Sequence, residues 1–295
     1  MSNPVESKVP LLPFLKWAGG KSRLIHQYKD YFPKTEFKSY YEPFLGGGSV
    51  FFYLQSNFQF NLAVLTDINP DLVETYCCVR DNVVELISLL KEHQDKHNND
   101  RSENHNYYYE VRKCRYTEPI QRAARLIYLN RTCFNGLYRE NSNGEFNVPI
   151  GKYKNPKICN PTLLYSASAA LKSAKIEVRH FEEIQDYAKT NDDFVYFDPP
   201  YHPRSKTSYF TAYSRHSFNE KDQRKLRDIF ASLAVQGVKV MLSNSDSDFI
   251  QKLYRDPKAF KDGKLPEIHR ISASRVINSK VNERGRISEV LITSY

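Results

Sequence analysis

Short apolar runs recur along the chain, and several of them end at polar or glycine-rich positions. Two of these runs, at residues 39–42 and 62–66, flank a glycine-rich turn and an apolar segment that begins a helix at Val50. A strand, a glycine turn, a helix and a second strand in this order predict a β-α-β unit and therefore parallel pairing. The alternation returns late in the chain, with strands expected at 176–178, 194–197, 238–243 and 287–293 and helices at 181–189 and 220–235.

The middle of the chain lacks this alternation. Apolar spacing predicts helices at 71–90, 107–116 and 120–132, whereas the polar stretch 94–106, rich in His and Asn, is expected to be an exposed loop. The pairs Asn135-Gly136 and Asn143-Gly144, flanked by Tyr, Phe and Val, predict turns and a β-hairpin. We therefore expect an α/β domain built from residues 1–70 and 159–295, with a helical insertion at 71–158 that carries the hairpin.

Composition adds a hint about partners. The net charge of +9 fits a polyanionic partner as well as it fits a merely basic soluble protein. The five cysteines show no metal-type pairing, so we expect reduced thiols and a cytoplasmic protein. No apolar stretch approaches the length that spans a bilayer. His93 and His97 stand one helical turn apart, but their polar surroundings favour a solvated helix end, and no metal is expected.

The strongest chemical signal is Asp198-Pro199-Pro200-Tyr201, directly after the strand expected at 194–197. Ligands of open α/β sheets bind beyond the carboxyl ends of strands, and two consecutive prolines stiffen the loop. Such a loop can hold the Asp198 carboxylate and a main-chain carbonyl so that both accept hydrogens from a planar amine, while Tyr201 offers a stacking face. The alternative is a proline-rich turn with an exposed aspartate, but the position after a buried strand favours catalysis.

Two further segments could bind a small ligand. The turn 42–48, Glu-Pro-Phe-Leu-Gly-Gly-Gly, allows close approach of the backbone at a helix start, although it lacks the G-x-G-x-x-G spacing of dinucleotide sites. Asp67, at the end of the next strand, could accept from ribose hydroxyls or could cap a helix. Around Gly19-Gly20, Trp17 and two lysines could clamp a carboxylate or phosphate, or could form only a glycine turn.

A fourth segment, residues 130–139, reads Asn-Arg-Thr-Cys-Phe-Asn-Gly-Leu-Tyr-Arg and suits DNA. Arginine can contact guanine through two hydrogen bonds, an apolar side chain can meet the thymine methyl, and a ring can wedge into the base stack. The same residues would also fit an ordinary surface hairpin.

Taken in this order, the motifs resemble the Dam family of DNA N6-adenine methyltransferases, of the α group, and look closest to its DpnM-type member. The similarity runs almost from end to end, and several motifs in one order are more specific than any single motif. Two positions depart from the family pattern. His180 stands where Asp is common, so the cofactor adenine could be held differently, and His202 stands where an apolar residue is frequent. The matching segments are residues 14–21, 42–49, 134–139, 146–149, 197–201 and 285–289.

The resemblance implies a Rossmann-like, S-adenosylmethionine-dependent methyltransferase domain with an inserted target-recognition domain. It implies methylation of adenine in GATC by base flipping, with S-adenosylhomocysteine as product. The catalytic residues would be Asp198, Pro199, Pro200 and Tyr201. The cofactor would be bound by Trp17, Ala18, Gly19, Lys21, Glu42, Phe44, Gly46, Gly48, Ser49, Asp67, Ile68, Phe181 and Asp198. Double-stranded DNA would be bound by Lys16, Phe134, Asn135, Gly136, Leu137, Arg139, Asn147 and Pro149.

By the same resemblance, each DNA-binding position has an expected role. Lys16 would contact the first guanine, and Arg139 a guanine further along the site. Leu137 and Pro149 would face a thymine methyl group, and Phe134 would wedge beside the flipped base pair. A restriction endonuclease is the expected protein partner if the enzyme protects DNA, and no such partner is needed if it acts alone.

Three alternatives stay open from the sequence. An N4-cytosine methyltransferase would use the same acceptor pair but more often has Ser in place of Asp198. An RNA adenine methyltransferase fits the tetrapeptide but not the segment 134–139. A DNA-binding regulator could carry the tetrapeptide as an inert remnant.

Overall fold

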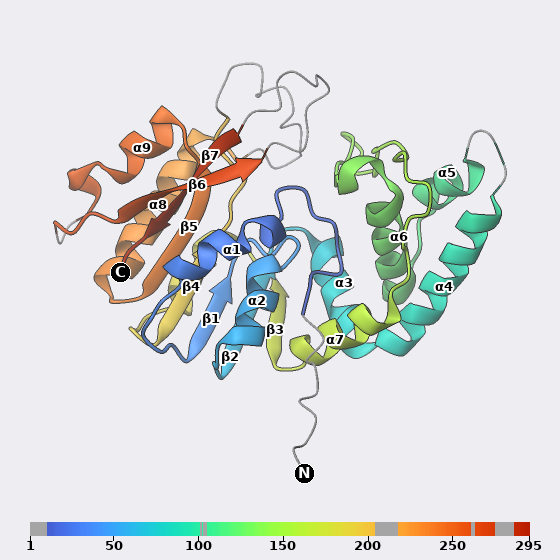
Figure 1. Ribbon diagram of the computed structural model, residues 1–295, viewed down its shortest axis with the longest axis horizontal. Helices are drawn as coiled ribbons and strands as arrows, with labels where there is room; N and C mark the ends of the chain where they lie inside the picture. Colours follow the sequence, from blue (N-terminus) through green and yellow to red (C-terminus); the bar gives the residue numbers. More distant parts are fainter. Residues whose placement is uncertain (1–10, 101, 103–104, 204–217, 261–262, 275–285) are drawn as a thin grey trace, which may run out of the picture.

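A seven-stranded mixed sheet lies at the centre of the computed structural model, which describes residues 11–100, 102, 105–203, 218–260, 263–274 and 286–295 (Figure 1). The order of strands across the sheet is β3-β2-β1-β4-β5-β7-β6. The strands are β1 (Ser39–Glu42), β2 (Leu62–Asp67), β3 (Ala174–Val178), β4 (Asp193–Phe197), β5 (Lys239–Ser245), β6 (Glu267–Ser274) and β7 (Arg286–Thr293).

Strand β1 lies between β2 and β4 and pairs with both in parallel. Strands β3 and β5 continue the parallel arrangement on either side, which confirms the expected parallel pairing. Strand β7 is antiparallel to both β5 and β6, and β6 was not predicted. Strands β2 and β3 follow on one side of β1, and β5 follows on the opposite side, beyond β4. The carboxyl ends of β1 and β4 therefore border the crevice where open α/β sheets bind ligands.

Alternate residues of each strand face opposite sides of the sheet, and this alternation builds two cores. In β4, Phe194 and Tyr196 join one core, whereas Val195 and Phe197 join the other. The first core is covered by α1 (Ile25–Tyr28), α2 (Ser49–Asn57), α3 (Pro70–Asp81) and α7 (Pro161–Leu171), and the second by α8 (Glu220–Val235) and α9 (Asp248–Tyr254) (Figure 1).

Three helices lie beyond the β3 edge of the sheet, namely α4 (Val83–Asn99), α5 (Asn106–Lys113) and α6 (Pro119–Thr132) (Figure 1). Helix α3 contacts β2 and β3 on one side and α6 on the other, so it joins this helical region to the sheet. The single helix predicted at 71–90 is therefore two helices, and they meet at Asn82.

The predicted loop at 94–106 is wrong for its first part, because α4 continues to Asn99. The reason is packing: the Nδ1 atoms of His93 and His97 lie 2.7 Å and 3.0 Å from the hydroxyls of Tyr107 and Tyr128. Burial lowers the pKa of His93 to about 4, so its ring is neutral and belongs to the helix contact rather than to a solvated end. Residues 101, 103 and 104 of the predicted loop lie outside the described ranges.

The chain after α6 folds back on itself. A short turn η3 (Phe134–Gly136) follows the helix, with Asn135 at φ +55° and Gly136 at φ +64°. Two isolated antiparallel bridges, Cys133 to Ile150 and Glu140 to Phe146, stand in place of a regular strand ladder in this described segment. The fold-back of the predicted hairpin is present, but the left-handed residues at its start interrupt continuous pairing.

Smaller differences complete the comparison with the prediction. The helix expected at 181–189 is the shorter η4 (Phe181–Asp186). Before β1, the chain forms η1 (Lys21–Arg23), α1 and η2 (Lys29–Tyr31). A last short turn is η6 (Pro257–Ala259). In the part of the chain that the structure describes, no helix is both long and apolar enough to cross a membrane.

Candidate active site

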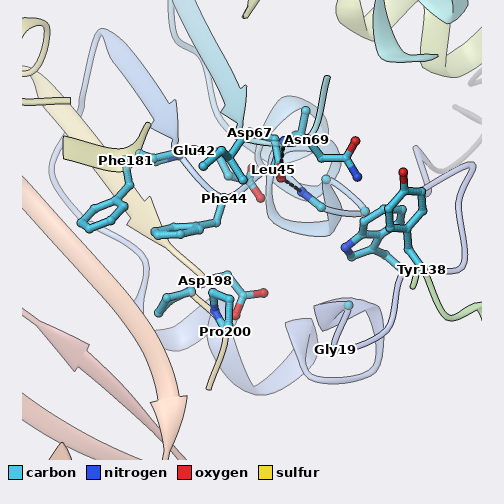
Figure 2. Close-up of a pocket in the computed structure, with 18 of the residues that line it drawn as sticks. Gly19, Glu42, Phe44, Leu45, Asp67, Asn69, Tyr138, Phe181, Asp198 and Pro200 are labelled. Carbon is cyan, nitrogen blue, oxygen red and sulfur yellow. Dashed lines mark hydrogen bonds between the residues drawn. The ribbon is translucent and has the colours of Figure 1, made fainter. Parts of the chain in front are cut away.

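A cavity of about 800 Å³ opens at the carboxyl ends of β1, β2 and β4 (Figure 2). Its walls come from the segment before α1, the glycine turn after β1, the loop after β2 and the loop after β4. The cavity brings together every residue predicted for the cofactor and for catalysis. They are Trp17, Ala18, Gly19, Lys21, Glu42, Phe44, Gly46, Gly48, Ser49, Asp67, Ile68, Phe181, Asp198, Pro199, Pro200 and Tyr201.

The glycine turn after β1 is required for the shape of this wall. Gly46 has φ +46°, and a Cβ atom there would stand 2.9 Å from Cδ1 of Trp17. Gly48 has φ +65°, and its Cβ would stand 2.8 Å from the Tyr76 hydroxyl. That hydroxyl donates to the carbonyl of Gly46 at 3.1 Å. Any side chain would therefore be strained by its backbone and would collide with a neighbouring ring.

Asp67 is fixed at the end of β2. Its Oδ2 accepts from the backbone N–H of Gly46 at 3.1 Å, and its Oδ1 accepts from that of Asn69 at 3.0 Å. Burial raises the pKa of Asp67, and these N–H donors oppose the rise. The side chain of Asn69, not that of Asp67, caps α3 by accepting from Asp71 and Leu72. The capping alternative for Asp67 is therefore wrong.

Aromatic rings form the apolar end of the cavity. Phe44 and Phe181 are stacked, with ring centroids 5.4 Å apart (Figure 2). Phe218 packs against both rings at 5.7 Å and 5.4 Å. His180, which departs from the family pattern, lies beside Phe181 with centroids 4.5 Å apart. This end of the cavity can accept a flat apolar ring.

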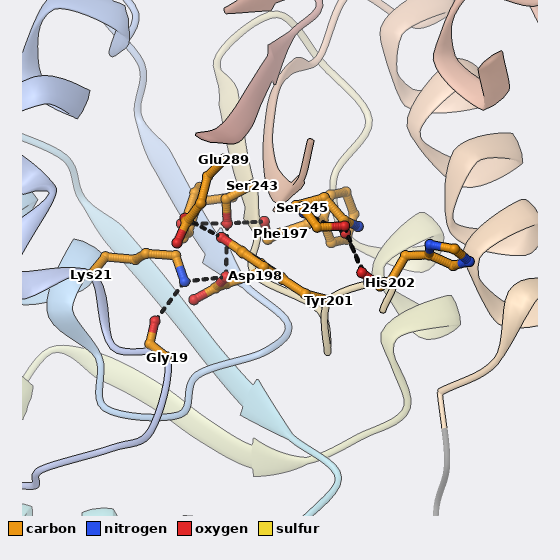
Figure 3. A network of polar contacts seen from close by, with 11 residues as sticks. Gly19, Lys21, Phe197, Asp198, Tyr201, His202, Ser243, Ser245 and Glu289 are labelled. Carbon is orange, nitrogen blue, oxygen red and sulfur yellow. Dashed lines mark hydrogen bonds and ion pairs between the residues drawn. The ribbon is translucent and has the colours of Figure 1, made fainter. Parts of the chain in front are cut away.

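Asp198 is held by two donors that both reach Oδ1 (Figure 3). The Lys21 ammonium lies 2.7 Å away, and the Ser243 hydroxyl donates at 2.7 Å. Lys21 is only 3% exposed and also donates to the carbonyl of Gly19 at 2.6 Å. The carboxylate therefore has a defined orientation at the cavity wall, with a buried positive charge beside it.

Tyr201 is oriented by Glu289, which closes the matching segment 285–289 but had no predicted role. Its hydroxyl donates to Oε2 of Glu289 at 2.8 Å, and Glu289 stands on β7 (Figure 3). Burial raises the pKa of Glu289, while the charge of Lys21 opposes the rise. The Lys21 ammonium also lies 4.7 Å from the centre of the Tyr201 ring. The ring is thus fixed at both its edge and its face.

His202, the second departure from the family pattern, is turned away from this network (Figure 3). Its Nδ1 lies 3.1 Å from the Ser247 hydroxyl, and its ring stacks on Phe249 with centroids 4.5 Å apart. Its backbone N–H donates to Asn244 at 3.1 Å, which anchors the end of the loop to β5. The histidine therefore supports the loop and does not line the cavity.

Glu42 occupies a buried position beneath the glycine turn. Its Oε2 accepts from the Tyr40 hydroxyl at 2.8 Å and from the backbone N–H of Phe51 at 3.1 Å. Burial raises the pKa of Glu42 to about 8, although these two donors oppose the rise. The side chain ties β1 to the first turn of α2 and so helps to hold the glycine turn in place.

The residues predicted to bind DNA also lie together. The backbone N–H of Phe134 donates to the carbonyl of Pro149 at 2.9 Å, and Nε of Arg139 donates to Oδ1 of Asn147 at 2.6 Å. The Phe134 ring is 46% exposed, so it is accessible to a partner. The two arms of the fold-back are thus joined through the predicted residues themselves.

Lys16 joins this group through Asn130, the first residue of the segment 130–139, for which the sequence predicted no role of its own. The backbone N–H of Lys16 donates to Oδ1 of Asn130 at 2.8 Å, and Nδ2 of Asn130 donates to the carbonyls of Lys16 and Gly136 at 3.0 Å and 3.2 Å. A Cβ atom on Gly136 would overlap the carbonyl oxygen of Lys16 at 2.3 Å. Glycine is therefore needed for this contact between two distant segments.

The seven-stranded mixed sheet and the Asp-Pro-Pro-Tyr loop after β4 are consistent with the class of α/β methyltransferases. A family model described as D12 class N6 adenine-specific DNA methyltransferase matches residues 17–277, and the chain belongs to this family. It is therefore a site-specific DNA N6-adenine methyltransferase. This identification decides against the cytosine, RNA and inert-regulator alternatives.

Curated relatives agree with the family. The type II methyltransferase M.MjaIII of Methanocaldococcus jannaschii is 42% identical over 96% of this chain and 99% of its own length. The type II methyltransferase M1.LlaDCHI of Lactococcus lactis subsp. cremoris is 40% identical over 98% of both chains. The DNA adenine methylase of Haemophilus influenzae is 35% identical over 97% of this chain and 95% of its own.

Within the described residues, no cluster of three or more His, Cys, Asp or Glu could hold a metal ion.

Proposed function

We propose that the enzyme transfers a methyl group from S-adenosylmethionine to N6 of adenine in duplex GATC, after flipping the base into the cavity. The observation that carries this proposal is the orientation of Asp198. Its Oδ1 is taken by Lys21 and Ser243, and within the described residues Oδ2 is left to accept from an incoming amine. A planar amine beside this oxygen would lie next to the ring of Tyr201.

The residues of the cavity fit the cofactor. The volume of the cavity is in the range of sites for small ligands. The glycine turn keeps the backbone close to Trp17, where any Cβ on Gly46 would intrude. Asp67 offers an acceptor for ribose hydroxyls, and Phe44 and Phe181 offer an apolar wall for the adenine ring. When bound, the cofactor supplies a methyl group activated by a sulfonium charge, and S-adenosylhomocysteine remains after transfer.

The chain's own groups orient the target amine. Asp198 and the carbonyl of Pro199 accept hydrogen bonds from the two hydrogens of N6. These bonds draw the nitrogen towards sp³ geometry and free its lone pair. Tyr201 stacks on the base, and its bond to Glu289 keeps the ring in one orientation. Orientation of this kind supplies much of the acceleration. After transfer the nitrogen is cationic and loses one proton to the Asp198 carboxylate or to solvent, so no strong base is needed beforehand.

Adenine N6 is paired and shielded in the duplex, so the base must leave the stack at a cost of a few kcal/mol. We propose that Phe134 fills the space it vacates, with Asn135 beside the unpaired thymine. The exposed ring of Phe134 supports this role. Lys16 and Arg139 would contact guanines, and Leu137 and Pro149 would contact a thymine methyl group, as the resemblance to the Dam family implies. Gly136 and Asn147 would keep these base-contacting residues in position, because Gly136 packs against Lys16 and Asn147 accepts from Arg139.

Catalysis and recognition of the target sequence would then belong to two separate domains. We propose that residues 1–70 and 159–295 form the catalytic domain and that residues 71–158 form the target-recognition domain. Helix α3 would connect them, because it contacts both the sheet and α6. Since two relatives are named type II methyltransferases, we further propose that the enzyme protects DNA beside a restriction endonuclease in the cytoplasm.

A plasmid protection assay tests the GATC proposal. Plasmid DNA free of adenine methylation is incubated with enzyme and S-adenosylmethionine, then treated with a nuclease that cuts only unmethylated GATC. We expect complete resistance, and normal cutting after treatment with Asp198→Ala enzyme. Full cutting by this nuclease, together with incorporation of labelled methyl groups into the same plasmid, would refute GATC while leaving the methyltransferase intact.

A further inference from the structure

Tyr138 belongs to two sites at once. In the sequence it stands between Leu137 and Arg139, two of the proposed base-reading residues. In the structure its side chain lines the cofactor cavity, at the opposite end from Phe44 and Phe181 (Figure 2). Its ring is stacked on Trp17, with centroids 5.6 Å apart and planes 26° apart. Neither the catalytic tetrapeptide nor the base-reading set accounts for this placement.

Trp17 continues the contact into the cofactor cavity. A Cβ atom on Gly46 would stand 2.9 Å from the indole, and one on Gly47 would stand 3.0 Å from Cβ of Trp17. The indole therefore packs closely against the glycine turn and also against Tyr138. A ligand that fixes the glycine turn and Trp17 would, through this contact, restrict the position of the Tyr138 ring.

The other end of Tyr138 is also anchored near the cavity. Its hydroxyl lies 2.5 Å from Oε1 of Glu140 and 3.3 Å from Oδ2 of Asp71, in the first turn of α3. Burial and these two carboxylates raise the pKa of Tyr138, so the hydroxyl keeps its proton and donates it. Asp71 follows Asp67 and Asn69, which form the cavity wall, by only a few residues.

The backbone on either side of Tyr138 carries the base-reading groups. Arg139 is linked to Asn147 at 2.6 Å, and the Tyr138 ring packs edge-on against Phe146 with centroids 5.8 Å apart. Since side chain and backbone of one residue move together, an ordered Tyr138 ring would order the arginine next to it.

We infer that Tyr138 couples cofactor binding to DNA binding, so that a bound cofactor increases the affinity of the enzyme for its target sequence. This inference rests on the proposed function, because it takes the cavity as the cofactor site and segment 134–139 as the base reader. Coupling between two sites is reciprocal, so cognate DNA must tighten cofactor binding by the same factor. Typical coupling factors are about 5–150-fold.

The test is a binding cycle with S-adenosylhomocysteine, which cannot donate a methyl group. The dissociation constant for a GATC duplex is measured with and without saturating S-adenosylhomocysteine, in the native enzyme and in Tyr138→Ala and Tyr138→Leu. Cofactor affinity is followed by the fluorescence of Trp17, which is the only tryptophan in the chain. Tyr138→Phe keeps the stacked ring, and Tyr165→Ala removes a 49% exposed tyrosine of α7 as a matched control.

We expect S-adenosylhomocysteine to tighten binding of the GATC duplex at least about fivefold in the native enzyme, in Tyr138→Phe and in Tyr165→Ala. The factor should fall below about twofold in Tyr138→Ala and Tyr138→Leu, even though each ligand still binds. A factor that stays unchanged in both variants, or is absent from the native enzyme while both ligands bind, overturns the coupling and leaves the proposed function standing. Failure of the native enzyme to bind either ligand would instead refute the proposed function, and the coupling with it.

Discussion

Replacing Asp198 with alanine should cost stability as well as activity. The variant leaves the Lys21 ammonium, 3% exposed, without its anionic partner. Breaking a buried ion pair from one side costs about 3–5 kcal/mol. The Asp198 side chain is 20% exposed, so water screens part of the loss, and we expect about 2–3 kcal/mol. Ser243 adds little to this cost, because its hydroxyl retains the Tyr196 hydroxyl at 2.9 Å.

The double variant Lys21→Met/Asp198→Ala separates the two effects. It removes both charges, so its free energy of unfolding should return to within about 1 kcal/mol of the native value, while methyl transfer stays absent. Urea unfolding followed by circular dichroism measures the stabilities. Asp192→Ala is the matched control, because it breaks a Lys–Asp pair of similar length at the surface, with Lys38, and should change little. An Asp198→Ala variant as stable as the native enzyme, or a double variant no more stable than the single one, would contradict a stabilising role for this ion pair.

Three further predictions concern Arg139, Gly46 and Glu42. Arg139→Ala should raise the dissociation constant of the GATC duplex about 5–150-fold, measured by fluorescence anisotropy, and an equal change on a duplex without GATC would argue against base reading. Gly46→Ala should lose about 1–3 kcal/mol more stability than Gly263→Ala, because both have positive φ but only the first methyl group meets Trp17; equal losses in urea unfolding would contradict this. The pKa of Glu42 is about 8 in the folded protein and 4.5 as its ordinary value, so the folded state keeps a proton that the unfolded state releases, and stability falls as pH rises from about 4.5 to about 8. Glu42→Gln should remove that part of the slope, and an unchanged slope would show that Glu42 is not the group responsible.

The sequence predicted the parts of the fold that local patterns encode. Strand β1 and helix α8 have the predicted bounds, because an aromatic run before a glycine turn and an amphipathic repeat are local signals. Helix α7 was missed although Pro161 stands at its first position and alanines follow, which are signals for a helix start and interior. The end of α4 could not be read locally, because His93 and His97 are stabilised by tyrosines of other helices.

The site divides in the same way. Residues in contiguous motifs, such as Asp198 and Gly46, were found because the motif marks the end of a strand. Ser243 was missed because it stands in an ordinary strand and acquires its role only through a partner far away in the chain. Its one available signal was a polar residue in an otherwise apolar strand, which is also common at surfaces. Glu289 and Asn130 lie in the segments 285–289 and 130–139 that the sequence marked, but their roles were not predicted because their partners, Tyr201 and Lys16, are far away in the chain.

Transfer of a methyl group to adenine N6 in GATC can be tested by identifying the methylated nucleoside. The enzyme is incubated with methyl-labelled S-adenosylmethionine and either a GATC duplex or one with the same bases in the order GTAC. The DNA is then digested to nucleosides and separated. We expect label only in N6-methyladenine and only from the GATC duplex. Label in N4-methylcytosine, or equal label from both duplexes, would contradict this expectation.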